Sequence, residues 1–285
     1  MAGLALCWGM SAAAQSAPPQ QQPAGGQKPA GQTPPQQPAQ PGAAAQNPTA
    51  EQPPASKEED DAYHTFYGLT DTQQVITQGE AFLAKFPNSR YRSSVYTHLV
   101  AAYTNTGDKE KIVAVGRKAL AENPDNTDVL AIVSTIIPRT ISDPRALDAD
   151  SKLTEAEKDA RRAIELIPNL PKPDGVTDEQ FVAVKNEKLG LAHFGLGLVY
   201  YMRGNANAYV PELDQASKLD PQPEPLVYYL LGTGDMRLKN YADAAAAYNK
   251  CANAKWDPQW QERCKKGEAQ AKQAAAAPPA ALVKP

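Results

Sequence analysis

Two cysteines near the C-terminus are the residues of this chain whose type and spacing most clearly point to chemistry. Cys251 lies near the end of one predicted helix, and Cys264 lies about two turns into the next. A turn near residues 256–258 would make these helices antiparallel and would bring both thiols to a similar height. We therefore predict a disulfide that holds the terminal helix to its neighbour in an exported protein. Two buried thiols are the alternative, and they are expected if the chain is not exported.

The three histidines have no spacing that is typical of a metal site or a catalytic site. His64, His98 and His193 lack a second histidine at i+4 with an intervening glutamate, so the sequence predicts no zinc site. It also lacks a G-x-S-x-G elbow, a phosphate loop with Gly-Lys-Ser/Thr and a dinucleotide-binding glycine fingerprint. We predict no catalytic residue, no metal, no cofactor and a protein that is not an enzyme.

The elements that position these residues are predicted to be paired helices. In the first half of residues 96–124, large side chains are spaced three and four apart and share one helix face: Tyr96, Leu99, Val100 and Tyr103. Gly107 and Asp108 form a turn signal, and Pro124 ends a second helical run. Two short helices cannot bury both of their faces alone, so further copies of the hairpin are expected.

Three further stretches repeat this pattern. Their defining residues are His193, Leu196, Gly197 and Tyr200 in the clearest copy, Tyr228, Leu231, Gly232, Tyr241 and Tyr248 in another, and Leu130, Val133, Ala156, Ala160 and Ala163 in a weaker one. With histidine in place of the large aromatic residue, the first set has the spacing W-x2-L-G-x2-Y. The series resembles the tetratricopeptide repeat (TPR) family over about residues 72–256. A helical bundle without repeats is the alternative.

The resemblance implies an all-α fold, a right-handed α-solenoid of about four TPR helical hairpins. Gly197 and Gly232 are expected where the helices of a hairpin approach closely. Pro138 and an insert at residues 139–153 depart from the repeat in the second hairpin. Residues 259–273 are predicted to form a C-terminal capping helix with its polar side chains outward.

Composition divides the chain into four segments. Residues 1–15 resemble a signal peptide, which we interpret as truncated because the positively charged start is missing. The alternative is that this stretch is not a signal. Residues 16–57 are rich in proline and glutamine and are predicted to be a disordered linker, because they have too few large apolar residues for a core. Residues 58–273 form the predicted TPR domain, and residues 274–285 form a predicted disordered tail.

In the TPR family the first helix of each hairpin lines the concave face, so the resemblance implies a peptide-binding groove there. The third and fourth copies would place aromatic side chains beside one arginine. By motif position the groove residues are Thr97, Ala101, Asn105, Phe194, Leu198, Tyr201, Tyr229, Thr233 and Arg237. The alternative is that these aromatic side chains simply pack on the long helix of the third copy.

The net charge of the chain limits the classes of partner that it is expected to bind. The net charge is −3 without a basic run, which argues against nucleic-acid binding. The mature chain has no predicted transmembrane segment. The junction at residues 86–91 is similar to junctions in bacterial envelope repeat proteins. We therefore expect a periplasmic or secreted scaffold that binds a protein or peptide. The alternatives are a wall- or peptidoglycan-associated structural protein and an accessory subunit of an envelope enzyme.

Overall fold

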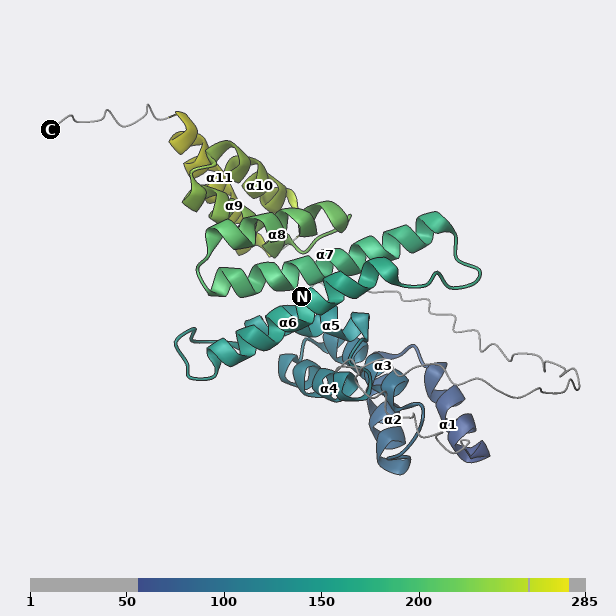
Figure 1. Ribbon diagram of the computed structural model, residues 1–285. Coiled ribbons are helices and arrows are strands. Elements are labelled where there is room, and N and C mark those ends of the chain that lie inside the picture. Colours follow the sequence, from purple (N-terminus) through teal and green to yellow (C-terminus); the bar gives the residue numbers. More distant parts are fainter. Residues whose placement is uncertain (1–55, 256, 277–285) are drawn as a thin grey trace, which may run out of the picture. The chain divides into compact units, whose positions relative to one another are not determined.

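The computed structural model describes residues 56–255 and 257–276. The predicted signal peptide, nearly all of the predicted linker and the last nine residues of the chain lie outside this part. Within it, all regular elements are helices (Figure 1). They are α1 (Lys57–Tyr67), α2 (Thr72–Lys85), α3 (Arg92–Thr106), α4 (Lys109–Glu122), α5 (Thr127–Ile136), η1 (Ile137–Thr140), α6 (Ala149–Leu166), η2 (Ile167–Asn169), α7 (Asp178–Met202), α8 (Ala206–Leu219), α9 (Pro225–Leu238), α10 (Tyr241–Asn253) and α11 (Pro258–Ala276).

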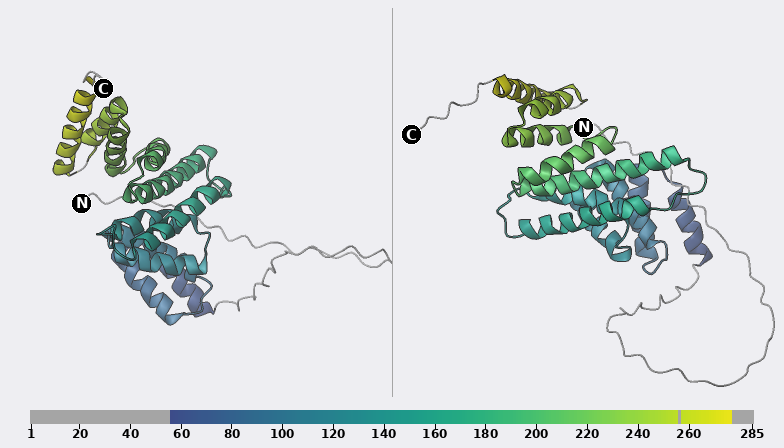
Figure 2. Two further views of the ribbon diagram at one scale, coloured as in Figure 1. Left: turned by 60° about the vertical axis from the view of Figure 1, so that its left-hand side comes forward. Right: turned by 45° about the horizontal axis from the view of Figure 1, so that its top comes forward.

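The helices form an α-solenoid in which each packs mainly on its neighbours in sequence. The four predicted hairpins are α3–α4, α5–α6, α7–α8 and α9–α10, and each consists of two helices in direct contact. Figures 1 and 2 show α6, the long α7 and α8 side by side in all three views. The helices α1 and α2 precede the predicted hairpins, and α11 follows them. The prediction of an all-α solenoid is therefore confirmed.

Local sequence signals explain the turns between paired helices. Gly107 and Gly204 have φ values of 74° and 73°, a left-handed conformation that glycine adopts without steric penalty. The next helix then begins at a side-chain cap: the carboxylate of Asp108 accepts a hydrogen bond from the Lys111 backbone N–H, and Asn205 caps α8 in the same way. These turns reverse the chain within two residues between α3 and α4 and within three residues between α7 and α8, and so bring the paired helices together.

Small residues allow the helices to pack closely. A Cβ atom added to Gly197 would lie 2.7 Å from the side chain of Leu213, where α7 crosses α8. A Cβ atom on Gly232 would lie 2.9 Å from the ring of Tyr248, where α9 crosses α10. The predicted close contacts therefore occur at both glycines. Because close packing at such points fixes how far apart the helices lie, these residues set the spacing within the hairpins.

The second hairpin departs from the predicted boundaries. Pro138 lies in η1, which continues directly from α5, so the proline does not distort the end of an α-helix. The helix α6 begins at Ala149, and the connection between η1 and α6 therefore spans residues 141–148, not 139–153. The first turn of α6 is helical because Ala149 and Leu153 are buried against the neighbouring helices. Leu147 remains fully exposed in the connection.

The long helix α7 begins at a capping box. The Gln180 backbone N–H donates to the Thr177 hydroxyl over 3.2 Å, and the Thr177 backbone N–H donates to the Gln180 side chain over 3.1 Å. Both bonds satisfy backbone donors that a helix start leaves unpaired. We expect Thr177→Ala to destabilise the first turn of α7 by about 1 kcal/mol. Hydrogen exchange of residues 178–182 should become faster, whereas Gln273→Ala in α11 should leave this exchange unchanged.

Candidate protein-binding face

One side of α9 carries three of the predicted groove residues. Tyr229, Thr233 and Arg237 are four residues apart and therefore lie on one face of the helix. The Thr233 hydroxyl donates to the Tyr229 carbonyl oxygen over 2.9 Å and lies 3.1 Å from the Tyr248 hydroxyl. Tyr229 and Thr233 are half-buried, and Arg237 is exposed. This row forms the centre of the candidate site.

The helix α7 adds an aromatic ring at one end of this row. The guanidinium carbon of Arg237 lies 6.0 Å from the centroid of the Tyr201 ring, within the range of a cation–π contact. The Tyr201 ring also packs edge-on against the buried ring of Tyr209, with centroids 5.5 Å apart. Tyr201 is half-buried, so part of this side chain remains accessible.

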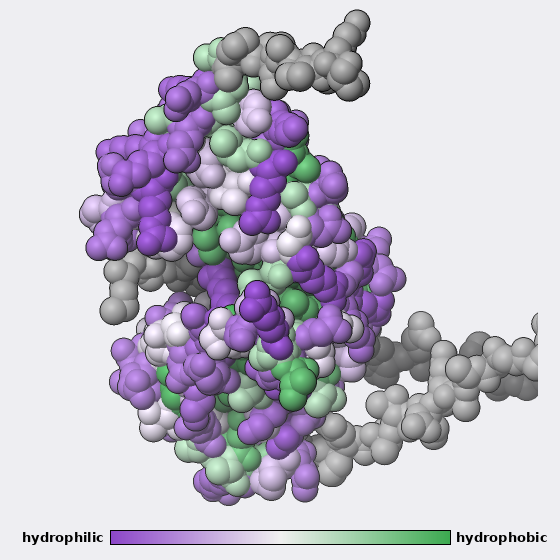
Figure 3. Space-filling model, turned by 90° about the vertical axis from the view of Figure 1, so that its left-hand side faces the viewer, coloured by the Kyte–Doolittle hydropathy of each residue, from purple (hydrophilic) through white to green (hydrophobic). Residues whose placement is uncertain are grey.

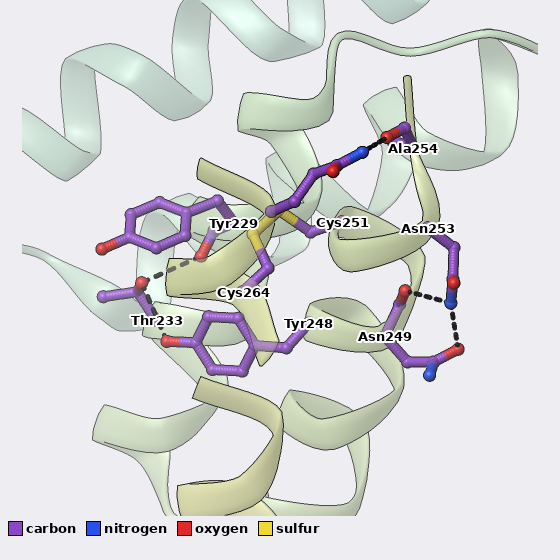
Figure 4. Close-up of a disulfide and its surroundings, with 9 residues drawn as sticks. Tyr229, Thr233, Tyr248, Asn249, Cys251, Asn253, Ala254 and Cys264 are labelled. Atoms are coloured by element: carbon purple, nitrogen blue, oxygen red, sulfur yellow. Dashed lines mark hydrogen bonds between the residues drawn. A yellow bond between two sulfur atoms is a disulfide. The ribbon is translucent and has the colours of Figure 1, made fainter. Parts of the chain in front are cut away.

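The helix α11 adds a second ring at the other end, and a disulfide holds it there. Cys251 and Cys264 are joined with their Cα atoms 5.8 Å apart, as the sequence predicted (Figure 4). Trp260, one turn before Cys264, packs edge-on against Tyr229 with centroids 5.2 Å apart. The guanidinium carbon of Arg263 lies 4.7 Å from the centroid of the Trp260 ring. The side chains that we call the aromatic face are Tyr201, Tyr229, Thr233, Arg237, Trp260 and Arg263.

The buried side chain of Tyr248 packs beneath the aromatic face and contacts Thr233. Figure 4 shows its ring beside Thr233 and the disulfide. The ring packs against two glycines from different helices, because a Cβ atom on Gly232 or Gly267 would lie within 2.9 Å of it. Burial raises the pKa of the Tyr248 hydroxyl, so the group is neutral at physiological pH and can share its hydrogen bond with Thr233. The ring thus joins α9, α10 and α11.

The structure corrects the predicted groove at two positions. Phe194 and Leu198 are only 3% and 5% exposed and belong to the core between α7, α8 and α9, so they cannot line an open surface. Arg139 from η1 covers the Phe194 ring, with 5.0 Å between its guanidinium carbon and the ring centroid. It is held there by an ion pair of 2.6 Å with Glu224, at the start of α9. This bridge between distant parts of the chain adds to the core packing that buries Phe194.

The first-copy residues of the predicted groove lie elsewhere. Thr97, Ala101 and Asn105 are on α3, and α5 packs between α3 and α7. Ala101 and Asn105 are exposed, whereas the Thr97 hydroxyl accepts a hydrogen bond of 2.7 Å from the Asn126 side chain at the start of α5. The structure therefore unites only four of the nine predicted residues in one face.

Two residues of the aromatic face were not among the predicted groove residues. Trp260 and Arg263 lie on the terminal helix, which was predicted to present only polar residues outward. The available signal was the spacing of four between Trp260 and Cys264, which places both side chains on one side of α11. Together with the predicted disulfide, this spacing directs Trp260 toward the preceding hairpin.

The histidine of the third hairpin has a structural contact. His193 is bonded over 2.7 Å to Glu212, a contact that ties α7 to α8. Across residues 56–276, apart from 256, no group of His, Cys, Asp and Glu side chains could hold a metal ion. In the same part, no helix has the length and hydrophobicity to span a bilayer. Figure 3 shows hydrophobic residues scattered among hydrophilic ones on one side of the molecule, without a single continuous hydrophobic area.

The repeated hairpins, their glycine contacts and their order along the chain form an all-α solenoid, the architecture expected from the resemblance to tetratricopeptide repeat proteins. No family model matches the sequence, and no curated protein matches it. Similar solved structures include a thermophilic TPR protein of Thermus thermophilus, with 17% identity over 73% of this chain and 98% of that chain and a TM-score of 0.47. A MamA RS-1 double mutant has 12% identity over 78% and 99% of the two chains and a TM-score of 0.42. A tetratricopeptide repeat protein of Parabacteroides merdae has 13% identity over 76% and 100% and a TM-score of 0.29.

Proposed function

We propose that this protein is a non-catalytic scaffold that binds a protein or peptide segment on the aromatic face. The supporting observation is that Tyr201, Tyr229 and Trp260 come from three different helices and lie half-exposed along one row, Trp260 against Tyr229 at one end and Tyr201 against Arg237 at the other. Tyrosine, tryptophan and arginine are the residues that most often dominate the binding energy of protein interfaces. Core packing and the disulfide hold these rings in place, so little side-chain entropy is lost on binding.

The two arginines define the chemistry of the proposed partner. Arg237 and Arg263 lie against aromatic rings, and neither forms an ion pair within the described part of the chain. Their guanidinium N–H groups can therefore donate to carboxylates of a bound segment. The segment that fits would combine apolar side chains, which contact the rings, with an acidic residue near one arginine.

We also propose that the protein acts outside the cytoplasm, in the bacterial cell envelope or as a secreted protein. The Cys251–Cys264 disulfide supports this compartment, because disulfides persist mainly in oxidising environments. The N-terminal stretch that resembles an export signal, which lies outside the described residues, agrees with it. Fractionation of cells with an antibody to the chain tests this part: recovery of the protein with the cytoplasm would contradict it.

Affinity capture from envelope extracts tests the binding face. We expect the double variant Tyr201→Ala and Tyr229→Ala to retain about a tenth or less of the partner that the wild type captures, because truncating interface aromatic residues commonly removes 2 kcal/mol or more. The matched control is Leu147→Ala, which removes a fully exposed apolar side chain far from the face in sequence. Circular dichroism should show that both variants are folded. Equal capture by all three proteins would exclude the aromatic face.

A further inference from the structure

A groove away from the aromatic face lies between the end of α4, the start of α5 and one side of α6. Its volume is about 650 Å³. Its apolar side is formed by Leu120, Pro124 and Leu130, and α6 supplies the polar side, which includes Thr154 and Asp159. The groove thus places a hydrocarbon surface next to a row of polar groups.

Asp159 is the unusual group in this groove. It is only 9% exposed, yet in the described part of the chain its carboxylate has no hydrogen-bond donor and no ion-pair partner. Ionised carboxylates are rarely buried without a compensating partner, because the desolvation penalty is large. Two nearby arginines are already engaged: Arg117 forms two bonds of 2.8 and 2.7 Å to Glu155, and Arg162 forms bonds of 2.8 and 2.9 Å to Asp125. Lys158 acts on Asp159 through its charge without forming an ion pair with it.

We propose that the groove binds a lysine side chain of a partner protein. The four-carbon stem of lysine would lie on Leu120 and Pro124, above the buried Leu130, and its ammonium group would donate to the Asp159 carboxylate. This occupant would cover the apolar side of the groove and would supply a donor in direct contact with the buried acid. An ammonium is a compact charge that one carboxylate can hold, whereas a guanidinium prefers a planar, two-bond partner.

The proposal predicts a pH dependence of binding. Burial, and next the charge of Glu155, raise the pKa of Asp159 to about 6, and Lys158 and Arg117 oppose this shift. An ammonium binds only to the ionised carboxylate, so affinity should rise as the pH rises through about 6. The other charged groups that line the groove are Asp125, Glu157, Lys158, Arg161, Arg162 and Glu165.

Titration of the full chain with n-butylammonium, followed by backbone amide NMR shifts, tests the site. We expect saturable shifts in residues 120–130 and 154–165, with a dissociation constant in the millimolar range. n-Butanol, which has the stem without the charge, should bind at least tenfold more weakly. Lowering the pH from 7 to 5 should weaken n-butylammonium binding about tenfold, because most of Asp159 is then protonated. Equal binding of amine and alcohol, or no saturable shift in the groove, would overturn the proposal.

Two matched variants separate the buried acid from the general charge of the surface. Asp159→Asn should abolish the saturable shifts, whereas Asp150→Asn, which removes an exposed carboxylate on the same helix outside the groove, should change the affinity by less than about twofold. Equal losses in both variants would contradict a site built on Asp159. If Asp159→Asn does not fold, the comparison of amine with alcohol and the pH series on the wild type still decide the question.

The same variant gives an independent prediction for stability. The pKa of Asp159 is raised on folding, so its contribution to stability is greatest at low pH and is lost as the pH rises through about 6. Asp159→Asn removes the buried charge and should raise the melting temperature by a few degrees at pH 7. The gain should disappear between pH 6 and 4, where the wild-type carboxyl becomes protonated. If the melting temperatures of Asp159→Asn and the wild type differ by the same amount at pH 7 and at pH 4, folding does not raise the pKa of Asp159.

Discussion

Replacing Gly195 by valine should destabilise the protein by about 3 kcal/mol or more, and we expect this to be the most damaging single substitution discussed here. Gly195 lies in α7 where it crosses α5. A Cβ atom added there would lie 2.3 Å from the Ser134 hydroxyl oxygen and 2.9 Å from the Ser134 carbonyl carbon. The hydroxyl could rotate away, but the carbonyl carbon belongs to the helix backbone, so the two helices would have to separate. Urea unfolding followed by circular dichroism measures the loss directly.

Gly68→Ala provides the matched control for this prediction. Gly68 follows α1 with a φ of −78°, and the nearest atoms to an added Cβ would be 3.7 Å away. The extra methyl group should therefore change the free energy of unfolding by less than about 1 kcal/mol. If Gly195→Val and Gly68→Ala unfold at the same urea concentration, the close crossing of α5 and α7 does not set the spacing of the solenoid.

Replacing both Cys251 and Cys264 by serine should lower the free energy of unfolding by about 3 kcal/mol. The disulfide restricts the unfolded chain, and both side chains are completely buried, so two serine hydroxyls would also be desolvated. The effect should be largest at α11, whose position the disulfide fixes. Native-state hydrogen exchange should show faster exchange in residues 258–276 of the variant, with little change in α3 and α4.

Reduction of the wild type is the control for the disulfide prediction. Dithiothreitol should shift the unfolding transition of the wild type toward that of the serine variant and should leave the variant itself unchanged. Both cysteines are buried, so reduction of the folded protein should be slow. The wild type must therefore be incubated with the reductant until the disulfide is reduced, before the unfolding transition is measured. Identical transitions of the oxidised, reduced and serine proteins would mean that the bond does not stabilise α11.

Much of the solenoid could be predicted because its signals are local. The turn at Gly107 and Asp108 depends on the conformational freedom of glycine and on a side-chain cap, and both are properties of adjacent residues. The glycine contacts at Gly197 and Gly232 follow from a fixed spacing within one hairpin. The start of α7 was also predictable, because Thr177 and Gln180 have the spacing of a capping box.

The candidate site was less predictable because it depends on long-range contacts. Phe194 is buried in the core between α7, α8 and α9 and is covered by Arg139, which pairs with Glu224; no local pattern reveals contacts between residues so far apart. Trp260 reaches Tyr229 because the disulfide fixes α11 on α10. Motif position alone could assign a residue to a helix face, but it could not show which faces the neighbouring helices cover.

The most direct test of the aromatic face is the affinity of a peptide selected from a random library on the wild-type protein. Calorimetric titration should show that Trp260→Ala binds this peptide at least about 30-fold more weakly, which corresponds to about 2 kcal/mol. Leu147→Ala should bind it with wild-type affinity. Peptides that bind Trp260→Ala and the wild type equally well would contradict the account, because the partner segment would then lie on another surface.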